Sequence, residues 1–220
     1  MSTQLEPTVD ESTIIARQRA GIDQFDEVWE GVYVMSPLAD LQHQDLDLTL
    51  AMILRICIDW CGLGQTFAGV NISDRRRNWR QNYRCPDVAV FLNETKAVAY
   101  KAHWFGGPDF GVEIVSENDR TLEKLPFYEK VRTRELLVIE RDPWALRLYR
   151  LEEDELRLSG TSLVDKPETL RSQVVPLSFQ LVSGMHAATS QESSLPVILI
   201  THHDGRQSWR VAPKPHGKIP

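Results

Sequence analysis

The sequence predicts a single mixed α/β domain with a C-terminal β extension, and two patterns lead to that prediction. Apolar residues recur at spacings of four and three through residues 41–61, which indicates a helix that buries one face. Short apolar runs bounded by Gly, Pro and Asp indicate buried strands, and the order strand, helix, strand between residues 110 and 140 is that of a βαβ unit with a parallel strand pair. With 220 residues, 42% of them hydrophobic and 25% charged, the chain can form one packed core.

The first half of the chain is expected to contain a hairpin, a long helix and two extended runs. The expected elements are a short helix at 14–20, a hairpin at 25–36, the long helix at 41–61, and extended runs at 65–73 and 83–92. Glu30 and Gly31 fit the hairpin turn, because glycine tolerates the positive φ that tight turns need. The buried face of the long helix would consist of Leu46, Leu50, Ile53, Cys57 and Trp60. Gly62 would end this helix.

The second half is expected to be built around the parallel strand pair. The expected elements are a strand at 110–116, a helix at 121–131, a strand at 135–140, a hairpin at 145–151 and 155–159, a packing segment at 174–182, and a terminal hairpin at 195–201 and 207–211. Pro126 should kink its helix or shorten the first turn, because proline lacks an N–H. The chain would thus consist of a disordered acidic tail over 1–12, one domain over 13–185, and a linker, hairpin and disordered end over 186–220.

Composition and simple motifs exclude several classes of protein. Acidic residues outnumber basic ones by 31 to 25, so coating of nucleic acid by bulk positive charge is not expected, although a local basic patch is compatible with the net charge of −6. The longest apolar stretch, residues 46–60, contains charges and is too short to span a bilayer, and the polar N-terminus has no signal pattern. We therefore expect a cytoplasmic protein with no membrane segment. The three cysteines lack Cys-x-x-Cys spacing and there is no Gly-rich phosphate loop, so we expect neither a zinc site nor a nucleotide cofactor.

Two acidic residues lie where the pattern expects apolar ones. Glu113 interrupts the apolar run 110–116, and Asp87 follows Pro86 at the start of another apolar run. A buried carboxylate is costly unless it meets a cation, a metal ion or donors, so Glu113 taken alone is most simply a strand-end Glu paired with an Arg. With Asp87 on a neighbouring strand, however, the two carboxylates can converge on Mg²⁺ or Mn²⁺. Lys124, on the next helix, would then stabilise charge on a phosphate, or else it lies on a solvated helix face.

The order and spacing of these motifs resemble the Uma-two family of the PD-(D/E)XK restriction-endonuclease-like superfamily. The matching segments are Pro86-Asp87, GVEIVS at 111–116, EKL at 123–125 with Tyr128, and ELLVI at 135–139, preceded by the Glu30-Gly31 hairpin, MSP at 35–37 and His43-Gln44. The resemblance covers roughly residues 25–185. It implies a restriction-endonuclease-like mixed β-sheet flanked by helices, with Asp87 and Glu113 as metal ligands and the carbonyl of Ile114 as a further candidate ligand.

The sequence departs from the superfamily pattern at one position. The superfamily lysine usually stands two residues after the second acid, where this chain has Val115. Lys124 is the candidate substitute, because a helix packed beside the strand can direct a long side chain to the same site. The departure puts catalytic competence in question more than it does the fold.

A second pattern bears on the substrate. Residues 74–84 contain one acid, Asp74, and five arginines: Arg75, Arg76, Arg77, Arg80 and Arg84. Guanidinium groups interleaved with Trp79 and Tyr83 suit phosphate contacts and base stacking, but they equally suit a solvated hairpin tip paired with the protein's own surface or a second subunit. Because the segment leads into the Asp87 strand, we expect it to lie close to the metal site. His43 and Gln44, at the start of the long helix, either line that site or form a plain surface pair.

These observations together predict a Mg²⁺- or Mn²⁺-dependent endonuclease that hydrolyses DNA phosphodiester bonds. Asp87, Glu113 and Lys124 are the expected catalytic residues. The alternative is a catalytically weak or inactive nuclease-fold module that binds nucleic acid or a protein partner, which Val115 and the net negative charge motivate. DNA is the expected partner, and a homodimer is expected because nucleases of this type often need two sites to cut both strands.

Overall fold

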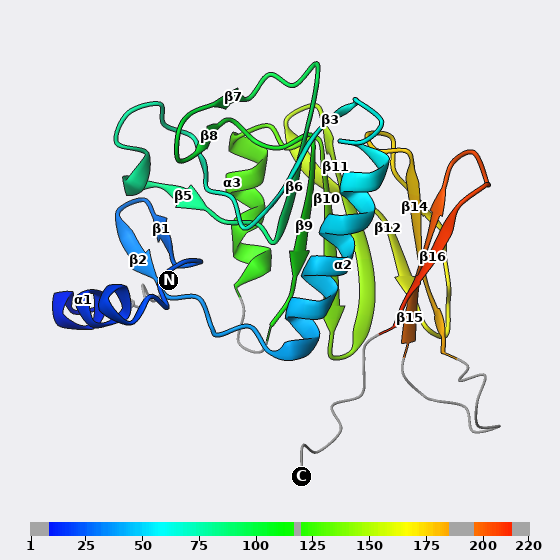
Figure 1. Cartoon of the computed structure of the whole chain (residues 1–220), viewed down its shortest axis with the longest axis horizontal. Coiled ribbons are helices and arrows are strands. Elements are labelled where there is room, and N and C mark those ends of the chain that lie inside the picture. Colours follow the sequence, from blue (N-terminus) through cyan, green and yellow to red (C-terminus); the bar gives the residue numbers. More distant parts are fainter. Residues whose placement is uncertain (1–8, 117–119, 185–195, 213–220) are drawn as a thin grey trace, which may run out of the picture.

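The computed structural model describes residues 9–116, 120–184 and 196–212, whose strands form three sheets (Figure 1). The central sheet has the order β12-β11-β10-β9-β6-β3. Its strands are β3 (Gly64–Ala68), β6 (Val88–Leu92), β9 (Phe110–Ile114), β10 (Glu135–Arg141), β11 (Trp144–Glu152) and β12 (Glu155–Leu163). β9 and β10 are parallel and the other neighbours are antiparallel, which confirms the predicted βαβ unit and the mixed sheet.

Helices pack on both faces of the central sheet. α2 (Leu41–Cys57) packs on one face, and α3 (Leu125–Lys130) lies on the other, where it follows the short 3-10 helix η2 (Thr121–Lys124). Val112 and Ile114 of β9 belong to the α2 side of the core. Successive side chains of a strand alternate between faces, so Glu113 points to the α3 side. Pro126 lies in the first turn of α3, as the sequence predicts, and the helix proper is short.

The long helix begins as predicted but ends earlier. Asp40 caps its N-terminus by accepting a hydrogen bond from the His43 N–H at 2.7 Å. Most of the predicted apolar face is buried, namely Leu46, Leu50, Ile53 and Cys57, together with Leu54. The prediction for Trp60 is wrong: the helix ends at Cys57, and the Trp60 residue lies 75% exposed in the turn beyond it. The helical spacing of apolar residues predicts burial within the helix but not beyond its last residue.

Each of the two long extended runs is divided between two sheets. The run at 65–73 breaks at Gly69, whose φ is +59°, and gives β3 in the central sheet and β4 (Ile72–Ser73) in a second sheet. The run at 83–92 breaks at Pro86 and gives β5 (Tyr83–Arg84) in the second sheet and β6 in the central one. Asp87 therefore lies at the junction of the two sheets.

The second sheet is formed by short strands in the order β2-β1-β5-β4-β8-β7. Its remaining strands are β1 (Glu27–Trp29), β2 (Val32–Val34), β7 (Val98–Ala99) and β8 (Trp104–Phe105), and the 3-10 helix η1 (Trp79–Gln81) precedes β5. β1 and β2 form the predicted hairpin around Glu30 and Gly31, whose φ angles are 47° and 91°. The first helix, α1 (Glu11–Ala20), begins three residues earlier than predicted because Asp10 caps it, so the expected loose tail does not extend to residue 12.

The C-terminal hairpin is part of the core. β15 (Pro196–His202) and β16 (Ser208–Val211) pair as predicted, and with β13 (Leu170–Arg171) and β14 (Leu177–Ser183) they form the third sheet. Ile198, Ile200 and Val211 pack in the same hydrophobic cluster as α2 and the central sheet. The linker expected over 186–195 and the end expected over 213–220 lie outside the described residues. Within the described part of the chain, no helix has the length and apolar character needed to cross a bilayer.

Candidate functional site

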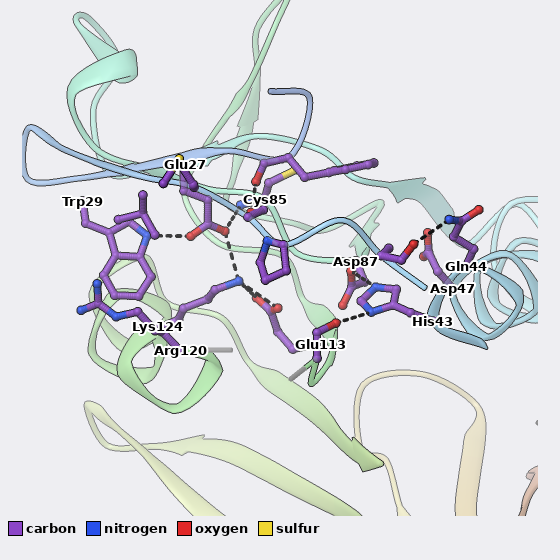
Figure 2. A pocket seen from close by; sticks show the side chains of 17 residues that line it. Glu27, Trp29, His43, Gln44, Asp47, Cys85, Asp87, Glu113, Arg120 and Lys124 are labelled. Atoms are coloured by element: carbon purple, nitrogen blue, oxygen red, sulfur yellow. Dashed lines mark hydrogen bonds and ion pairs between the residues drawn. The ribbon is translucent and has the colours of Figure 1, made fainter. Parts of the chain in front are cut away.

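A cavity of about 460 Å³ lies between the N-terminal hairpin, the start of α2 and the ends of β6 and β9 (Figure 2). Among the described residues, four carboxylates line it: Glu27, Asp47, Asp87 and Glu113. Three side chains that can carry positive charge also line it: His43, Arg120 and Lys124. The structure thus brings the three residues predicted to be catalytic into one cavity, together with His43 and Gln44.

Strand pairing brings Asp87 and Glu113 together. The antiparallel register of β6 and β9 pairs Val88 with Val112, and continuing it by one residue sets Asp87 opposite Glu113. Directly opposite residues of an antiparallel pair point to the same face of a sheet. Asp87 lies one residue before β6, however, and its carboxylate turns to His43 of α2, while that of Glu113 meets Lys124 and Tyr128. The two carboxylates, 26 residues apart in the sequence, thus line one cavity at the same end of the central sheet (Figure 2).

The Asp87 carboxylate is oriented by donors from two other elements. Nε2 of His43 lies 2.9 Å from Oδ1, and the Ile114 N–H donates to Oδ2 at 2.6 Å. Nδ1 of His43 lies 2.9 Å from the Ser116 hydroxyl, so the imidazole is held at both nitrogens. The Asp87 side chain is 20% exposed and lines the cavity. Asp87 is thus fixed in orientation but still accessible from the cavity.

The Glu113 carboxylate is nearly inaccessible and meets a cation and a hydroxyl. Its side chain is 3% exposed, Nζ of Lys124 lies 3.1 Å from Oε2 and 3.3 Å from Oε1, and the Tyr128 hydroxyl donates to Oε1. Lys124 comes from η2 and Tyr128 from α3, four residues later. The helix after β9 therefore directs Lys124 back onto Glu113, in the arrangement that the sequence predicted for a displaced lysine.

Glu27 of β1 is a partner that the sequence did not reveal. Oε1 of Glu27 lies 3.1 Å from Nζ of Lys124 and accepts a hydrogen bond from the Cys85 N–H at 2.9 Å. Oε2 accepts from Nε1 of Trp29 at 2.6 Å. Lys124 is therefore held between two buried carboxylates, one from each sheet. No sequence signal connects Glu27 with a lysine 97 positions further along the chain.

Burial and like charge raise the pKa values of two acids in the cavity. Burial raises the pKa of Glu113; Lys124 opposes that rise, while Asp87 and Glu27 add to it. Burial also raises the pKa of Asp47 to about 6, with a further contribution from Asp87 and an opposing one from His43. The Oδ1 atom of Asp47 is buried without a hydrogen-bond partner among the described residues. Asp47 lies four residues after His43 on α2, a helical spacing that could have placed both on one face.

The imidazole of His43 responds to two opposing influences. Burial lowers its pKa, but the hydrogen bond and the charge of Asp87 outweigh burial, so the pKa of His43 is raised above its usual value. The protonated form of His43 is thereby favoured beside the Asp87 carboxylate.

The arginine segment lies away from the cavity, contrary to the expectation that it adjoins the acid pair. Of Arg75, Arg76, Arg77 and Arg80, none lines the cavity. Arg75 pairs with Glu30 and Asp74, the Arg76 guanidinium lies 4.9 Å from the Phe105 ring centre, and that of Arg80 lies 5.5 Å from the Trp79 ring centre. Arg84 differs from these four: it is buried, and its guanidinium lies 4.4 Å from the ring centres of both Trp29 and Phe127. At Pro86 the chain passes from the second sheet, which the arginines precede, to the central sheet, which Asp87 precedes.

The carboxylates fit a hard divalent cation of the kind that keeps several waters. Within the described residues, no three His, Cys, Asp or Glu side chains are grouped closely enough to hold a metal ion by themselves. Magnesium commonly takes only one or two protein carboxylates and completes its shell with water and phosphate oxygens. Asp87 and Glu113 supply such a pair, and the unpartnered Oδ1 of Asp47 is a buried acceptor in the same cavity wall.

The central sheet is mixed and flanked by helices, and it carries this acid pair at the ends of two inner strands, β6 and β9. This arrangement defines a restriction-endonuclease-like protein. The chain belongs to the Uma2 family, described as "Putative restriction endonuclease", whose model matches residues 23–184. Both the family and the fold class predicted from the sequence are thus confirmed. No curated protein matches the chain.

A solved structure shows the same fold. It is the crystal structure of "a putative nuclease belonging to DUF820" from Anabaena variabilis ATCC 29413, with a TM-score of 0.50 and 16% sequence identity, and the match covers 60% of this chain and 75% of that one. The fold and the family together support a nuclease function.

Proposed function

We propose that this protein is a metal-dependent nuclease that hydrolyses phosphodiester bonds of DNA at the cavity containing Asp87 and Glu113. The observation that carries the proposal is the convergence of these two carboxylates, on neighbouring strands, with a lysine ammonium 3.1 Å from Glu113. Membership of the Uma2 family and the nuclease-like fold support it.

Asp87 and Glu113 would hold Mg²⁺ or Mn²⁺, with the Ile114 carbonyl as a further candidate ligand. Such a cation, when bound, polarises a phosphoryl oxygen and neutralises the charge that develops on the phosphate. The neighbouring groups then have separate tasks. The Ile114 N–H and the Nε2–H of His43 keep the Asp87 carboxylate in one orientation, and Ser116 holds the other nitrogen of that imidazole.

Lys124 would supply a fixed positive charge beside the reacting phosphate. A preorganised cation in a site of low polarity stabilises a transition state more than the same cation does in water. Glu27 acts as a positioning residue, because its carboxylate accepts from Lys124 on the side opposite Glu113. If the ammonium swung away, Glu113 would lose its ion pair with Lys124 and Glu27 would keep the more distant Arg84 guanidinium, at 4.0 Å.

DNA as the partner and a homodimer as the assembly remain part of this proposal. The arginine segment 75–80 is the candidate contact for DNA outside the cavity, since Arg76, Arg77 and Arg80 are exposed. Sedimentation of the purified protein with and without DNA would measure both properties, and a monomer at all concentrations would reject the dimer.

The proposal is tested by cleavage of a labelled oligonucleotide mixture, single-stranded and duplex, with Mg²⁺ or Mn²⁺. Asp87→Asn and Glu113→Gln preserve shape and remove charge, and each is expected to reduce the rate at least about 100-fold while the protein stays folded by circular dichroism. Glu140→Gln is the matched control, because Glu140 lies on β10 outside the cavity and pairs with Arg147.

The outcomes distinguish a nuclease from a catalytically inactive module that binds nucleic acid. Loss of cleavage in both site variants, with wild-type rates in the control, supports the assignment. Cleavage near the wild-type rate in either site variant rejects these residues as the site. A wild type that binds nucleic acid but cuts none of the substrates would instead support the catalytically inactive module.

A further inference from the structure

The cavity is too confined for a DNA duplex. Its volume of about 460 Å³ is that of a pocket that encloses one small ligand. A duplex is far larger, since its major groove alone is about 12 Å wide. With the Glu113 side chain 3% exposed and that of Asp87 20% exposed, both carboxylates lie below the protein surface. Among the described residues that line the cavity, neither carboxylate stands out at the surface, and this favours a strand thin enough to enter over a duplex that stays outside.

The N-terminal segment that narrows the cavity is braced within itself and tied to its neighbours, for the Tyr83 hydroxyl of β5 donates to the Asp26 carbonyl at 2.9 Å. Asp26, which is 2% exposed, binds three separate parts of it: the Arg17 guanidinium at 2.6 Å, the Ser36 N–H at 2.8 Å and the Tyr33 hydroxyl at 2.5 Å. Glu27, one residue later, is tied to Lys124 and to the Cys85 N–H. The confinement is thus built into the fold by several buried hydrogen bonds.

The cavity wall offers apolar and aromatic surface beside the acids. Phe25 and Met35, each nearly half exposed, line the cavity from the N-terminal segment, and so does Trp29. An unpaired base presents a flat face that stacks on aromatic rings and arginine planes, whereas paired bases are already stacked. The Arg120 guanidinium, 4.5 Å from the Trp29 ring centre, adds such a plane.

The charges of the cavity fit one phosphate better than a row of them. Among the described residues, its cationic groups are His43, Arg120 and Lys124, which pair with Asp87, with Glu123, and with Glu27 and Glu113, respectively. Proteins that bind a duplex through its backbone typically neutralise about 6–10 phosphates. The arginines at 75–80, which could follow a longer backbone, do not line the cavity.

We propose that the site acts on unpaired nucleic acid: a single strand, or the single-stranded end of a duplex, enters the cavity one nucleotide at a time. The entering base stacks on Phe25, and its phosphate approaches Lys124 and the cation that Asp87 and Glu113 would hold. This inference rests on the proposed nuclease function, whose substrate class it specifies.

The test compares one labelled sequence as a single strand, as a blunt duplex and as a duplex with a long single-stranded overhang, in Mn²⁺. We expect the single strand to be cut at least 10-fold faster than the blunt duplex, and the overhang to be cut within its unpaired part. Phe25→Ala should lower single-strand cleavage several-fold. Tyr100→Ala is the matched control, because Tyr100 is an aromatic residue of similar exposure that does not line the cavity. Internal cleavage of the blunt duplex at the single-strand rate would overturn the inference and leave the nuclease function standing.

Binding separates the two proposals if cleavage is absent. Fluorescence anisotropy of the single strand and of the blunt duplex, with Glu113→Gln in Ca²⁺, reports affinity without turnover. Tighter binding of the single strand, weakened by adding Phe25→Ala, supports the inference even where no substrate is cut, an outcome that rejects the nuclease function alone. Equal or tighter binding of the duplex overturns the inference.

Discussion

Two lysines six residues apart, Lys124 and Lys130, lie in opposite surroundings although each is held between two carboxylates. Nζ of Lys124 lies 3.1 Å from Glu27 and 3.1 Å from Glu113, and its side chain is 11% exposed. Nζ of Lys130 lies 3.2 Å from Glu30 and 2.6 Å from Asp74, and its side chain is 55% exposed. The hairpin contributes one acid to each lysine, Glu27 from β1 and Glu30 from the turn.

The difference shows that the distances between charges do not by themselves decide how much an ion pair contributes to stability; exposure to water matters as well. At Lys130 water competes for the half-exposed ammonium and for Glu30, whereas the Asp74 side chain is 10% exposed, so this cluster depends less on each of its charges. At Lys124 water is largely excluded, so each charge depends on the others and the removal of one leaves the rest unpaired. Such an arrangement costs free energy to maintain, and this cost is one reason why we propose a function for Lys124 and none for Lys130.

The largest expected effect is on stability. Lys124→Met, which takes the ammonium from Glu113 and leaves Glu27 with the Arg84 guanidinium at 4.0 Å, should reduce the free energy of unfolding by about 3–5 kcal/mol. Lys130→Met, the matched control from α3, the helix that follows η2, should reduce it by about 0–1 kcal/mol. Urea denaturation of both variants at pH 7.5 measures the contrast. Equal losses would show that the two clusters do not differ as their burial implies.

A smaller effect is expected from pH. The folded-state pKa of Asp47 is about 6, above the ordinary value of 3.8, so the folded protein binds a proton there more tightly than the unfolded chain does. The contribution of Asp47 to stability is therefore greatest below pH 4 and is lost as the pH rises through about 6. Asp47→Asn should gain stability relative to the wild type between pH 5 and pH 7.5, measured by urea denaturation without divalent metal. If the difference in the free energy of unfolding between the two proteins stayed constant with pH, the raised pKa of Asp47 would be refuted.

The smallest effect on the fold is expected at the arginine segment. Replacing Arg76 and Arg77 together by alanine should change the free energy of unfolding by less than about 1 kcal/mol, because both are exposed. If the segment binds nucleic acid, the slope of log affinity against log salt should become shallower by about 1.4 for a single strand. Fluorescence anisotropy at several salt concentrations measures this slope. An unchanged slope would remove the segment from the nucleic-acid contact.

The sequence predicted the parts of the site that lie on regular elements. Asp87 and Glu113 could be found because a charged residue at a strand end or within an apolar strand is conspicuous, and Lys124 because it follows on the next helix. Glu27 could not be found, since its role depends on a second sheet that brings the hairpin onto η2. The same crossing of the chain between sheets, at Gly69 and Pro86, moved the arginine segment away from the cavity, and adjacency in sequence gave no sign of it.

Calorimetric titration with Mn²⁺ tests most directly whether Asp87 and Glu113 form a functional metal site. Wild type and Lys130→Met should each bind Mn²⁺ saturably with the same affinity, and Asp87→Asn should lose that binding while remaining folded. An uncleavable phosphorothioate oligonucleotide is added in a second titration, because substrate phosphates often complete such sites. Binding that persists unchanged in Asp87→Asn, or a wild type that binds no Mn²⁺ even with the oligonucleotide present, would contradict the assignment.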